Sequence, residues 1–335
     1  KFTYSFAAAE AMVPHILGSY RAYLDTCTSW DSIEENTELF ICFGGVPLKN
    51  GQIAQGGTGS HKQKEKLIRS ANAGIKFVNF SPLKSDLLDE VNGEWLALRP
   101  NTDVAIMLGL AHTLYKEKLY DDKFIEKYTE GFDTFLPYLK GDIDGIVKDA
   151  NWASSISEIP SEKITSLAKE MSSKRTMISV SWSLTRQDHG EQPFWAAIML
   201  ASMVGQIGLP GGGFGFGYSA TNHIGGQFSI IPGAAFPQTE NKIEDFIPVA
   251  RISDLLLNPG GSFDFDGKEY KYPDIKLIYW AGGNPFHHHQ DINRLLQAWQ
   301  KPETIISNEW CWNSLAKYSD IILPCTTPLE RQDIM

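Results

Sequence analysis

The stretch Tyr279-Trp-Ala-Gly-Gly-Asn-Pro-Phe-His-His-His-Gln-Asp291 follows the apolar run Asp274-Ile-Lys-Leu-Ile278 and precedes a helical pattern at 292–299. The run is typical of a buried parallel strand, so the glycines, amides and imidazoles after it lie in a loop at the carboxyl end of that strand. Open α/β sheets bind ligands at this end because backbone N–H groups and short polar side chains converge there. The stretch therefore predicts an α/β fold with a ligand-binding loop.

The rest of the chain alternates between strand and helix patterns. Strands are predicted at 39–43, 75–80, 177–182, 275–281, 304–307 and 321–323, with a β-hairpin at 263–270. Helices are predicted at 63–69, 103–119, 121–129, 132–139, 161–173, 191–207, 249–257, 292–300 and 313–318. This alternation favours right-handed crossovers and a parallel sheet that is covered on both faces. The five glycines within 211–217 argue against a strand there, and 218–246 is predicted to be a long ordered loop between two domains.

Composition excludes several classes of protein. A chain of 335 residues with 42% hydrophobic and 21% charged residues is long enough for two domains. Its net charge of -10 argues against nucleic-acid binding, which needs a basic face, and no apolar run is long enough to span a membrane. The four cysteines lie far apart, so we expect neither an iron–sulfur cluster nor a zinc site. No charged-then-apolar leader stands at the start, so we expect a leader to have been removed or never present.

Each predicted strand ends in a polar loop, and these loops predict a nucleotide-like ligand across the strand ends. Asp103 suits the two N–H donors of a guanine edge, and a plain helix N-cap is the alternative, which the residue pattern alone favours. Lys49 and Arg186 suit pyrophosphate or pterin oxygens, and Ser81 and Ser183 suit ribose or phosphate. For Lys49 an ordinary solvated lysine is the alternative. Consecutive histidines at 287–289 point in different directions, so we expect no metal site there.

Several motifs together resemble one known family. They are Arg99-Pro-Asn-Thr-Asp-Val-Ala-Ile-Met107, Arg186-Gln-Asp-His-Gly-Glu-Gln192, Gly205-Gln-Ile-Gly-Leu-Pro-Gly-Gly-Gly-Phe-Gly215, Gly282-Gly-Asn-Pro-Phe286 and Asp320-Ile-Ile-Leu-Pro324 with Glu330-Arg331. The chain is similar in this to the molybdopterin oxidoreductases, in particular to the branch that reduces S-oxides and N-oxides. The resemblance implies two Rossmann-like doubly wound domains of a larger four-domain α/β enzyme. Residues 1–219 would bind one molybdopterin guanine dinucleotide, and 220–335, part of the second domain, would bind the other around a shared molybdenum.

The resemblance also implies a set of cofactor-binding residues. They are Lys49, Ser81, Asn101, Thr102, Asp103, Trp182, Ser183, Arg186, Gly283, Asn284, His289, Gln290, Asn308 and Asp320. No residue here matches the serine that ligates molybdenum in this branch. That serine is expected upstream, and the chain is expected to be a piece of a longer enzyme.

By resemblance, the expected activity is oxygen-atom transfer from a small S-oxide or N-oxide, such as biotin, methionine or dimethyl sulfoxide or trimethylamine N-oxide. A c-type cytochrome or another redox protein is the expected electron donor, and the periplasm the expected compartment, with the cytoplasm as the alternative. Two other functions stay open: a non-catalytic scaffold subunit that keeps the pterin-binding fold, and a nucleotide-binding dehydrogenase. The absence of GxGxxG counts against the dehydrogenase.

Overall fold

The computed structural model divides into two compact units, Ser5–Ile230 and Ile231–Met335. The residues that it describes are 6–51, 60–226 and 247–332, together with 237, 239, 240 and 242. Residues up to 226 pack with the first unit: the Trp30 amide donates to the Gly225 carbonyl at 2.7 Å. The division therefore falls later than the expected position after residue 219. Most of the loop predicted over 218–246 lies outside the described residues.

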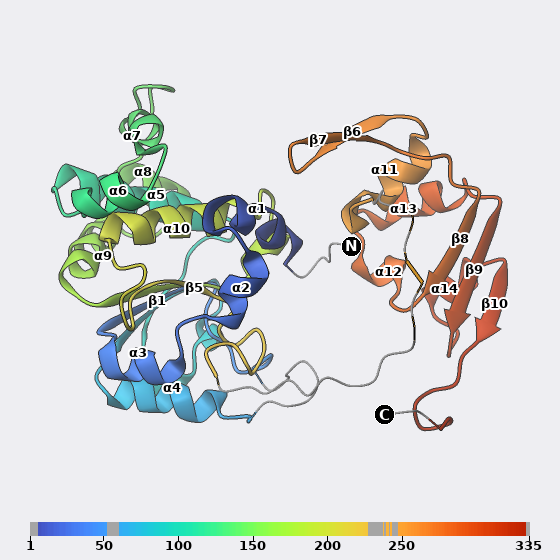
Figure 1. Ribbon diagram of the computed structural model, residues 1–335, viewed down its shortest axis with the longest axis horizontal. Coiled ribbons are helices and arrows are strands. Elements are labelled where there is room, and N and C mark those ends of the chain that lie inside the picture. Colours follow the sequence, from blue (N-terminus) through green and yellow to red (C-terminus); the bar gives the residue numbers. More distant parts are fainter. Residues whose placement is uncertain are drawn as a thin grey trace. The chain divides into compact units, whose positions relative to one another are not determined.

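The first unit contains a parallel sheet of five strands in the order β3-β2-β1-β4-β5 (Figure 1). Its strands are β1 (Leu39–Phe43), β2 (Lys76–Phe80), β3 (Glu94–Leu96), β4 (Thr176–Val180) and β5 (Gly213–Phe216). Phe43 at the end of β1 is level with Phe80 on one side and Val180 on the other. The chain runs outward from β1 to β3 on one side and then adds β4 and β5 on the other. The direction of winding therefore reverses between β1 and β4.

Strand β5 contradicts the prediction that 211–217 is a loop. It pairs in parallel with β4, and both of its phenylalanines, Phe214 and Phe216, are buried. Gly215 leaves room for Tyr218, because a Cβ at this glycine would lie 2.6 Å from the tyrosine ring. Burial of these three aromatic rings offsets the entropy that the glycines lose. The same rings belong to the core of the first unit.

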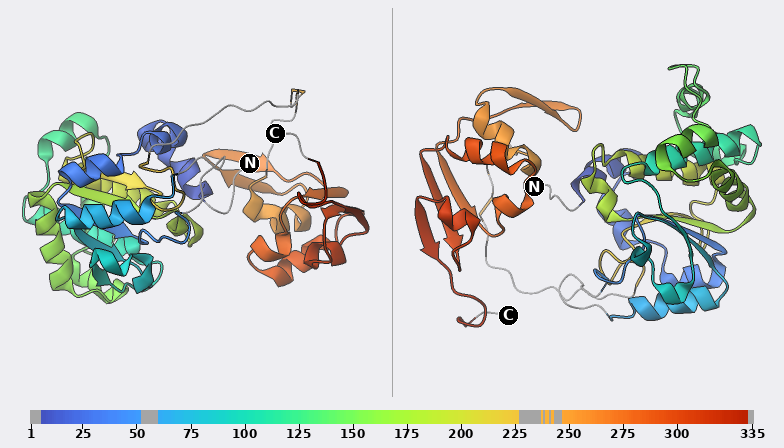
Figure 2. Two further views of the ribbon diagram at one scale, coloured as in Figure 1. Left: turned by 90° about the horizontal axis from the view of Figure 1, so that it is seen from below. Right: turned by 180° about the vertical axis from the view of Figure 1, so that it is seen from behind.

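Helices cover both faces of this sheet, as the sequence predicts for it. They are α1 (Ala7–Leu17), α2 (Tyr20–Asp25), α3 (Trp30–Asn36), α4 (Gln63–Asn72), α5 (Asp103–Lys116), α6 (Asp122–Tyr128), α7 (Phe132–Lys140), α8 (Ala150–Ser157), α9 (Ser161–Ser173) and α10 (Gln192–Val204). Helices α3 and α4 lie along one face, and α5 and α10 lie along the other (Figures 1 and 2). Helix α5 is apolar around most of its circumference, which suits a helix packed between the sheet and other helices.

The second unit contains a smaller parallel sheet in the order β10-β9-β8. Its elements are α11 (Ile252–Leu257), the hairpin β6 (Ser262–Phe265) and β7 (Lys268–Lys271), β8 (Leu277–Ala281), α12 (Pro285–His288), α13 (Ile292–Trp299), β9 (Thr304–Glu309), α14 (Ser314–Lys317) and β10 (Ile321–Pro324). The predicted hairpin and all three strands are confirmed. Leu295 and Trp299 of α13 pack with Ile305 of β9 in a core of modest size.

One face of this second sheet is not covered by any described residue. Leu277, Tyr279, Ile321 and Leu323 alternate along β8 and β10 and are each between 42% and 56% exposed. The crossovers from β8 to β9 and from β9 to β10 run in the same direction, so right-handed connections place their helices on the same face (Figures 1 and 2). The prediction of a sheet covered on both faces is therefore confirmed for the first unit only. No helix among the described residues is long and apolar enough to cross a membrane.

Candidate functional site

The loops that follow β1 and β4 meet where the winding of the first sheet reverses. Gly44 and Gly45, directly after β1, have φ values of 82° and 76°, which glycine adopts without strain. A Cβ at Gly44 would lie 2.8 Å from the Cβ of Ser181 and 3.3 Å from the Oγ of Ser183, so glycine allows the two loops to approach. Ligands of open α/β sheets bind at such a reversal, at the carboxyl ends of the strands. This edge is therefore the candidate site of the first unit.

Asp103 lies in the chain that leads from β3 into α5, and it is 2% exposed. Its Oδ1 has no hydrogen-bond partner among the described residues. Burial raises the pKa of this carboxyl from its ordinary value to about 7. The N-cap alternative is wrong, because Thr102 is the N-cap and Asp103 is the first helical residue. A buried carboxylate oxygen without a partner among the described residues needs a hydrogen-bond donor, which a ligand or water can supply.

The residues after β1 and β2 are joined by an aspartate that sequence reasoning missed. Asp86 accepts a hydrogen bond from the Ser81 hydroxyl at 2.7 Å and one from the Lys49 ammonium at 3.2 Å. Its backbone carbonyl also accepts from the Val46 amide at 2.7 Å. Ser81 is fully buried and its hydroxyl is used within the chain, whereas the Lys49 side chain is 64% exposed. Of these two predicted residues, only Lys49 faces solvent. An acidic residue six positions after a predicted strand was the signal that could have found Asp86.

The residues after β4 form a short 3-10 helix, Trp182–Arg186. Trp182 is buried against Phe6, with ring centroids 4.8 Å apart, and its indole N–H has no partner among the described residues. Ser183 is exposed and its hydroxyl donates to that of Ser181 at 2.9 Å. Arg186 is also exposed, and so is Asn101, at a φ of 66°. The predicted residues of the first unit therefore all follow carboxyl ends of neighbouring strands.

A second group of predicted residues lies at the carboxyl edge of the sheet β8–β10. Asn284 is the N-cap of α12: its Oδ1 accepts from the Phe286 amide at 3.0 Å, whereas its buried Nδ2 has no partner among the described residues. Asn308 is level with Ala281 at the end of β8 and donates to the Tyr279 hydroxyl at 3.1 Å. Further along the same loop, burial lowers the pKa of His289.

Three further predicted residues complete the account of this unit. Gly283, directly before Asn284, has a φ of 69°, and Gln290 is exposed. The structure does not bring Asp320 to this edge. It precedes β10 at the amino edge of the sheet, where its carboxylate accepts from the Ile305 amide at 2.8 Å. In the described part of the chain, no group of three or more histidine, cysteine, aspartate or glutamate residues is placed to hold a metal ion.

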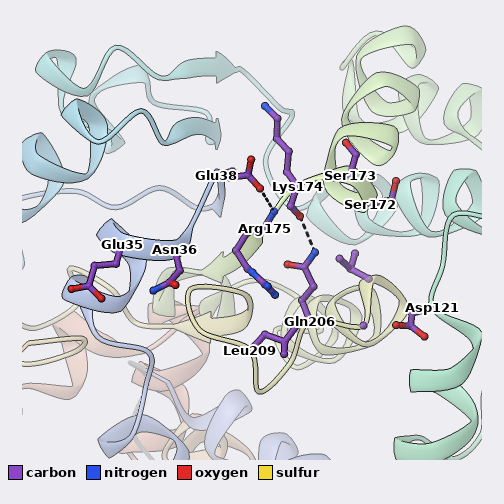
Figure 3. A pocket seen from close by; sticks show the side chains of 12 residues that line it. Glu35, Asn36, Glu38, Asp121, Ser172, Ser173, Lys174, Arg175, Gln206 and Leu209 are labelled. Carbon is purple, nitrogen blue, oxygen red and sulfur yellow. Dashed lines mark hydrogen bonds between the residues drawn. The ribbon is translucent and has the colours of Figure 1, made fainter.

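The amino edge of the first sheet carries a polar hollow (Figure 3). Gln206 bridges two segments there: its Oε1 accepts from the Thr176 amide and its Nε2 donates to the Lys174 carbonyl, both at 2.8 Å. Glu38 accepts from the Arg175 amide at 2.8 Å. These side chains satisfy backbone groups where β1 and β4 begin. None of the predicted site residues lines this hollow, so we assign it a structural role.

Comparison with known proteins supports the resemblance. Residues 4–335 match the family model described as "Molybdopterin oxidoreductase". Biotin sulfoxide reductase of Cereibacter sphaeroides is 47% identical over 99% of this chain and 45% of its own length. Dimethyl sulfoxide/trimethylamine N-oxide reductase of Rhodobacter capsulatus is 44% identical over 99% of this chain and 41% of its own length. Trimethylamine-N-oxide reductase of Haemophilus influenzae is 43% identical over 100% of the chain and 42% of its own length.

The chain thus spans less than half the length of these relatives. Among solved structures, acetylene hydratase from Pelobacter acetylenicus matches with a TM-score of 0.54 over 95% of this chain and 44% of that protein. At 14% identity this likeness concerns the fold alone. On the family model and the identities of its relatives, the chain belongs to the molybdopterin oxidoreductase family.

Proposed function

We propose that this chain belongs to a molybdenum-dependent reductase of S-oxides or N-oxides. We propose also that it forms part of the binding site for a bis(molybdopterin guanine dinucleotide) cofactor. The observation that carries the proposal is the Asp103 carboxylate at the carboxyl edge of the sheet, which is buried and whose Oδ1 has no partner among the described residues. A guanine edge offers two parallel N–H donors to such a carboxylate. The sulfoxide and N-oxide reductases among the relatives support this class of substrate.

The residues present fit such a group. In the first unit, a Rossmann-like domain in this proposal, Asp103 would accept from the guanine, next to Asn101 and Thr102. Lys49 and Arg186 would pair with phosphate or pterin oxygens. Ser183 would donate to them, and so would the indole N–H of Trp182, which has no partner among the described residues. In the second unit, Gly283, Asn284, His289, Gln290 and Asn308 would hold the other dinucleotide. We leave Asp320 out of the site, because it lies at the opposite edge of its sheet.

The bound molybdenum centre supplies two-electron oxygen-atom transfer, and the residues of this chain bind and orient the cofactor around it. The position of the cofactor matters because the reaction needs the cofactor and the substrate to be aligned with each other. Exposed donors such as Lys49 and Arg186 would reduce the electrostatic repulsion between the phosphate groups of the cofactor. Buried groups such as Asp103 and Trp182 select for ring edges that match their donors and acceptors.

The proposal is tested on the protein purified with its cofactor. We expect molybdenum and guanine nucleotide to be present in stoichiometric amounts, and reduction of a sulfoxide or an N-oxide with reduced viologen as the donor. A scaffold subunit would carry the pterin group without activity. A dehydrogenase would exchange hydride with nicotinamide and contain no molybdenum.

We further propose a c-type cytochrome or a related redox protein as the electron donor, and the periplasm as the compartment. The relation to trimethylamine-N-oxide and sulfoxide reductases supports the need for an external donor. Cell fractionation tests the compartment, and a cytoplasmic location would exclude a periplasmic cytochrome. Oxidation of the reduced cytochrome by the purified enzyme in the presence of substrate tests the donor.

Arg186→Lys is expected to lower cofactor retention several-fold, although the charge is unchanged. Lysine offers three donors on a flexible stem, whereas the guanidinium holds two oxygens in a fixed plane. Cofactor content after gel filtration is the measurement. Arg175→Lys, at the amino edge of the same sheet, is the matched control and should leave the content unchanged. Full retention in Arg186→Lys would remove this residue from the site.

A further inference from the structure

Asp86 occupies a position that the proposed cofactor site does not yet use. It ends a 3-10 turn, Lys84–Asp86, and its side chain returns to Ser81, the residue directly after β2. Its side chain is 13% exposed, so it is mostly enclosed but reaches the surface of the carboxyl edge. Asp86 is therefore the carboxylate that stands next to the end of β2.

The orientation of this carboxylate is fixed from several sides. The Ser81 hydroxyl donates to Oδ2 and itself accepts from the Leu83 amide at 3.2 Å. The Asp86 backbone is held by the Val46 amide and lies against Gly45, where an added Cβ would come within 2.5 Å of the Asp86 Cβ. A side chain held in this way loses little conformational entropy when a ligand binds.

The chemistry of Asp86 favours hydroxyl groups over phosphate. A carboxylate only accepts hydrogen bonds, so it repels phosphate oxygens and attracts the O–H donors of a sugar. Among the described residues, Oδ1 accepts one hydrogen bond, from Lys49, and Oδ2 accepts one, from Ser81, so each oxygen keeps a second lone pair for a ligand. The Ser81 hydroxyl is already used, so it cannot replace Asp86 as the partner of a ligand in this state.

The strand order of the first sheet also favours the ribose as the part of a nucleotide that Asp86 contacts. In a sheet ordered 3-2-1-4-5, a dinucleotide lies across the carboxyl ends, with its phosphates at the first turn and its ribose beside an acidic residue beyond the second strand. Gly44 and Gly45 form that first turn here, and Asp86 is the acidic residue beside the end of β2. We propose that Asp86 binds the ribose hydroxyls of the nucleotide held by the first unit and that Ser81 positions its carboxylate. This inference rests on the proposed function.

The test compares nucleotides that differ only in these hydroxyls. GDP and 2′,3′-dideoxy-GDP are titrated calorimetrically against the cofactor-free protein. We expect GDP to bind about tenfold more tightly, since a hydrogen bond to a charged group is involved. Asp86→Ala should reduce the affinity for GDP to that for dideoxy-GDP and leave the affinity for dideoxy-GDP unchanged. Ser81→Ala should reduce the preference for GDP in part, and Asp86→Glu should retain more of it than Asp86→Ala.

Asp89→Asn is the matched control, because Asp89 lies in the next turn of the chain and its side chain is 83% exposed. It should leave the preference for GDP intact. Equal affinity of the unaltered protein for both nucleotides, with binding abolished by Asp103→Ala, would overturn the ribose assignment while the nucleotide site stands. Failure of the unaltered protein to bind either nucleotide would overturn the nucleotide site, and the ribose assignment with it.

Discussion

Asp103→Asn is expected to stabilise the cofactor-free protein above pH 7 and at the same time to lower its cofactor content. The folded protein raises the pKa of Asp103 to about 7 because the carboxyl is buried. The neutral carboxyl contributes to the free energy of unfolding. This contribution is fully present below the ordinary pKa near 4 and is lost as the pH rises through the folded-state pKa of about 7. The difference between these two pKa values corresponds to about 4 kcal/mol at most. Asparagine keeps the shape of the side chain and removes this loss.

The free energy of unfolding in urea, measured at pH 4.5 and pH 8, checks this expectation. The variant should be nearly as stable as the unaltered protein at pH 4.5 and more stable by about 2–4 kcal/mol at pH 8. Asp122→Asn is the control, since it removes an exposed acidic residue from the first turn of α6 and should cost less than about 1 kcal/mol at either pH. Equal stability of the variant and the unaltered protein at pH 8 would contradict the raised pKa of Asp103. Undiminished guanine nucleotide in the purified variant would contradict the assignment of Asp103 to the guanine.

Gly45→Ala is expected to destabilise the protein by about 2–4 kcal/mol, from about 1–2 kcal/mol of backbone strain and a similar cost of overpacking. The φ of Gly45 is 76°, and its added Cβ would meet both the backbone and the Cβ of Asp86. Relief of this contact has to move the loop after β1 away from Asp86. The variant should therefore also lose cofactor.

Gly74→Ala separates the two causes of this effect. Gly74 has a φ of 94°, but no atom lies within 4 Å of its added Cβ, so only the strain of about 1–2 kcal/mol applies. Thermal unfolding of both variants, together with their cofactor content, gives the comparison. Equal losses of stability in the two variants would show that the contact between Gly45 and Asp86 does not matter.

Elements with a clear apolar pattern were predictable from the sequence, and elements defined by their neighbours were not. The runs at β1 and β4 identify buried strands by themselves. The run at β8 identifies a strand, but the expectation that it is buried is wrong, because one of its faces is exposed. Strand β3 has three residues and is partly exposed, so it carries no pattern, and β5 is a strand only because β4 and Tyr218 are beside it. The predicted loops at the carboxyl edges followed from topology, because parallel strands bring their ends together.

The details of the site depended on contacts that a linear pattern does not contain. The N-cap alternative for Asp103 is wrong by one residue, because Thr102 occupies the cap and Asp103 begins the helix. Asp86 belongs to the site through Ser81 and Lys49, which are distant from one another in the sequence. Asp320 has the residue type of a ligand-binding group, but its position before β10 places it at the wrong edge.

The unequal cores of the two units have a consequence for how the protein opens. Amides in β1 lie between paired strands under helices on both faces, so they exchange with solvent only when the whole first unit unfolds. The sheet of the second unit has helices on one face only among the described residues, and few large side chains hold it together. We therefore expect its amides to exchange through smaller and more frequent openings. The loops that follow β8 and β9 belong to this second unit, whose opening we expect to require less free energy than that of the first. A ligand bound at these loops should therefore slow amide exchange more in the second unit than in the first.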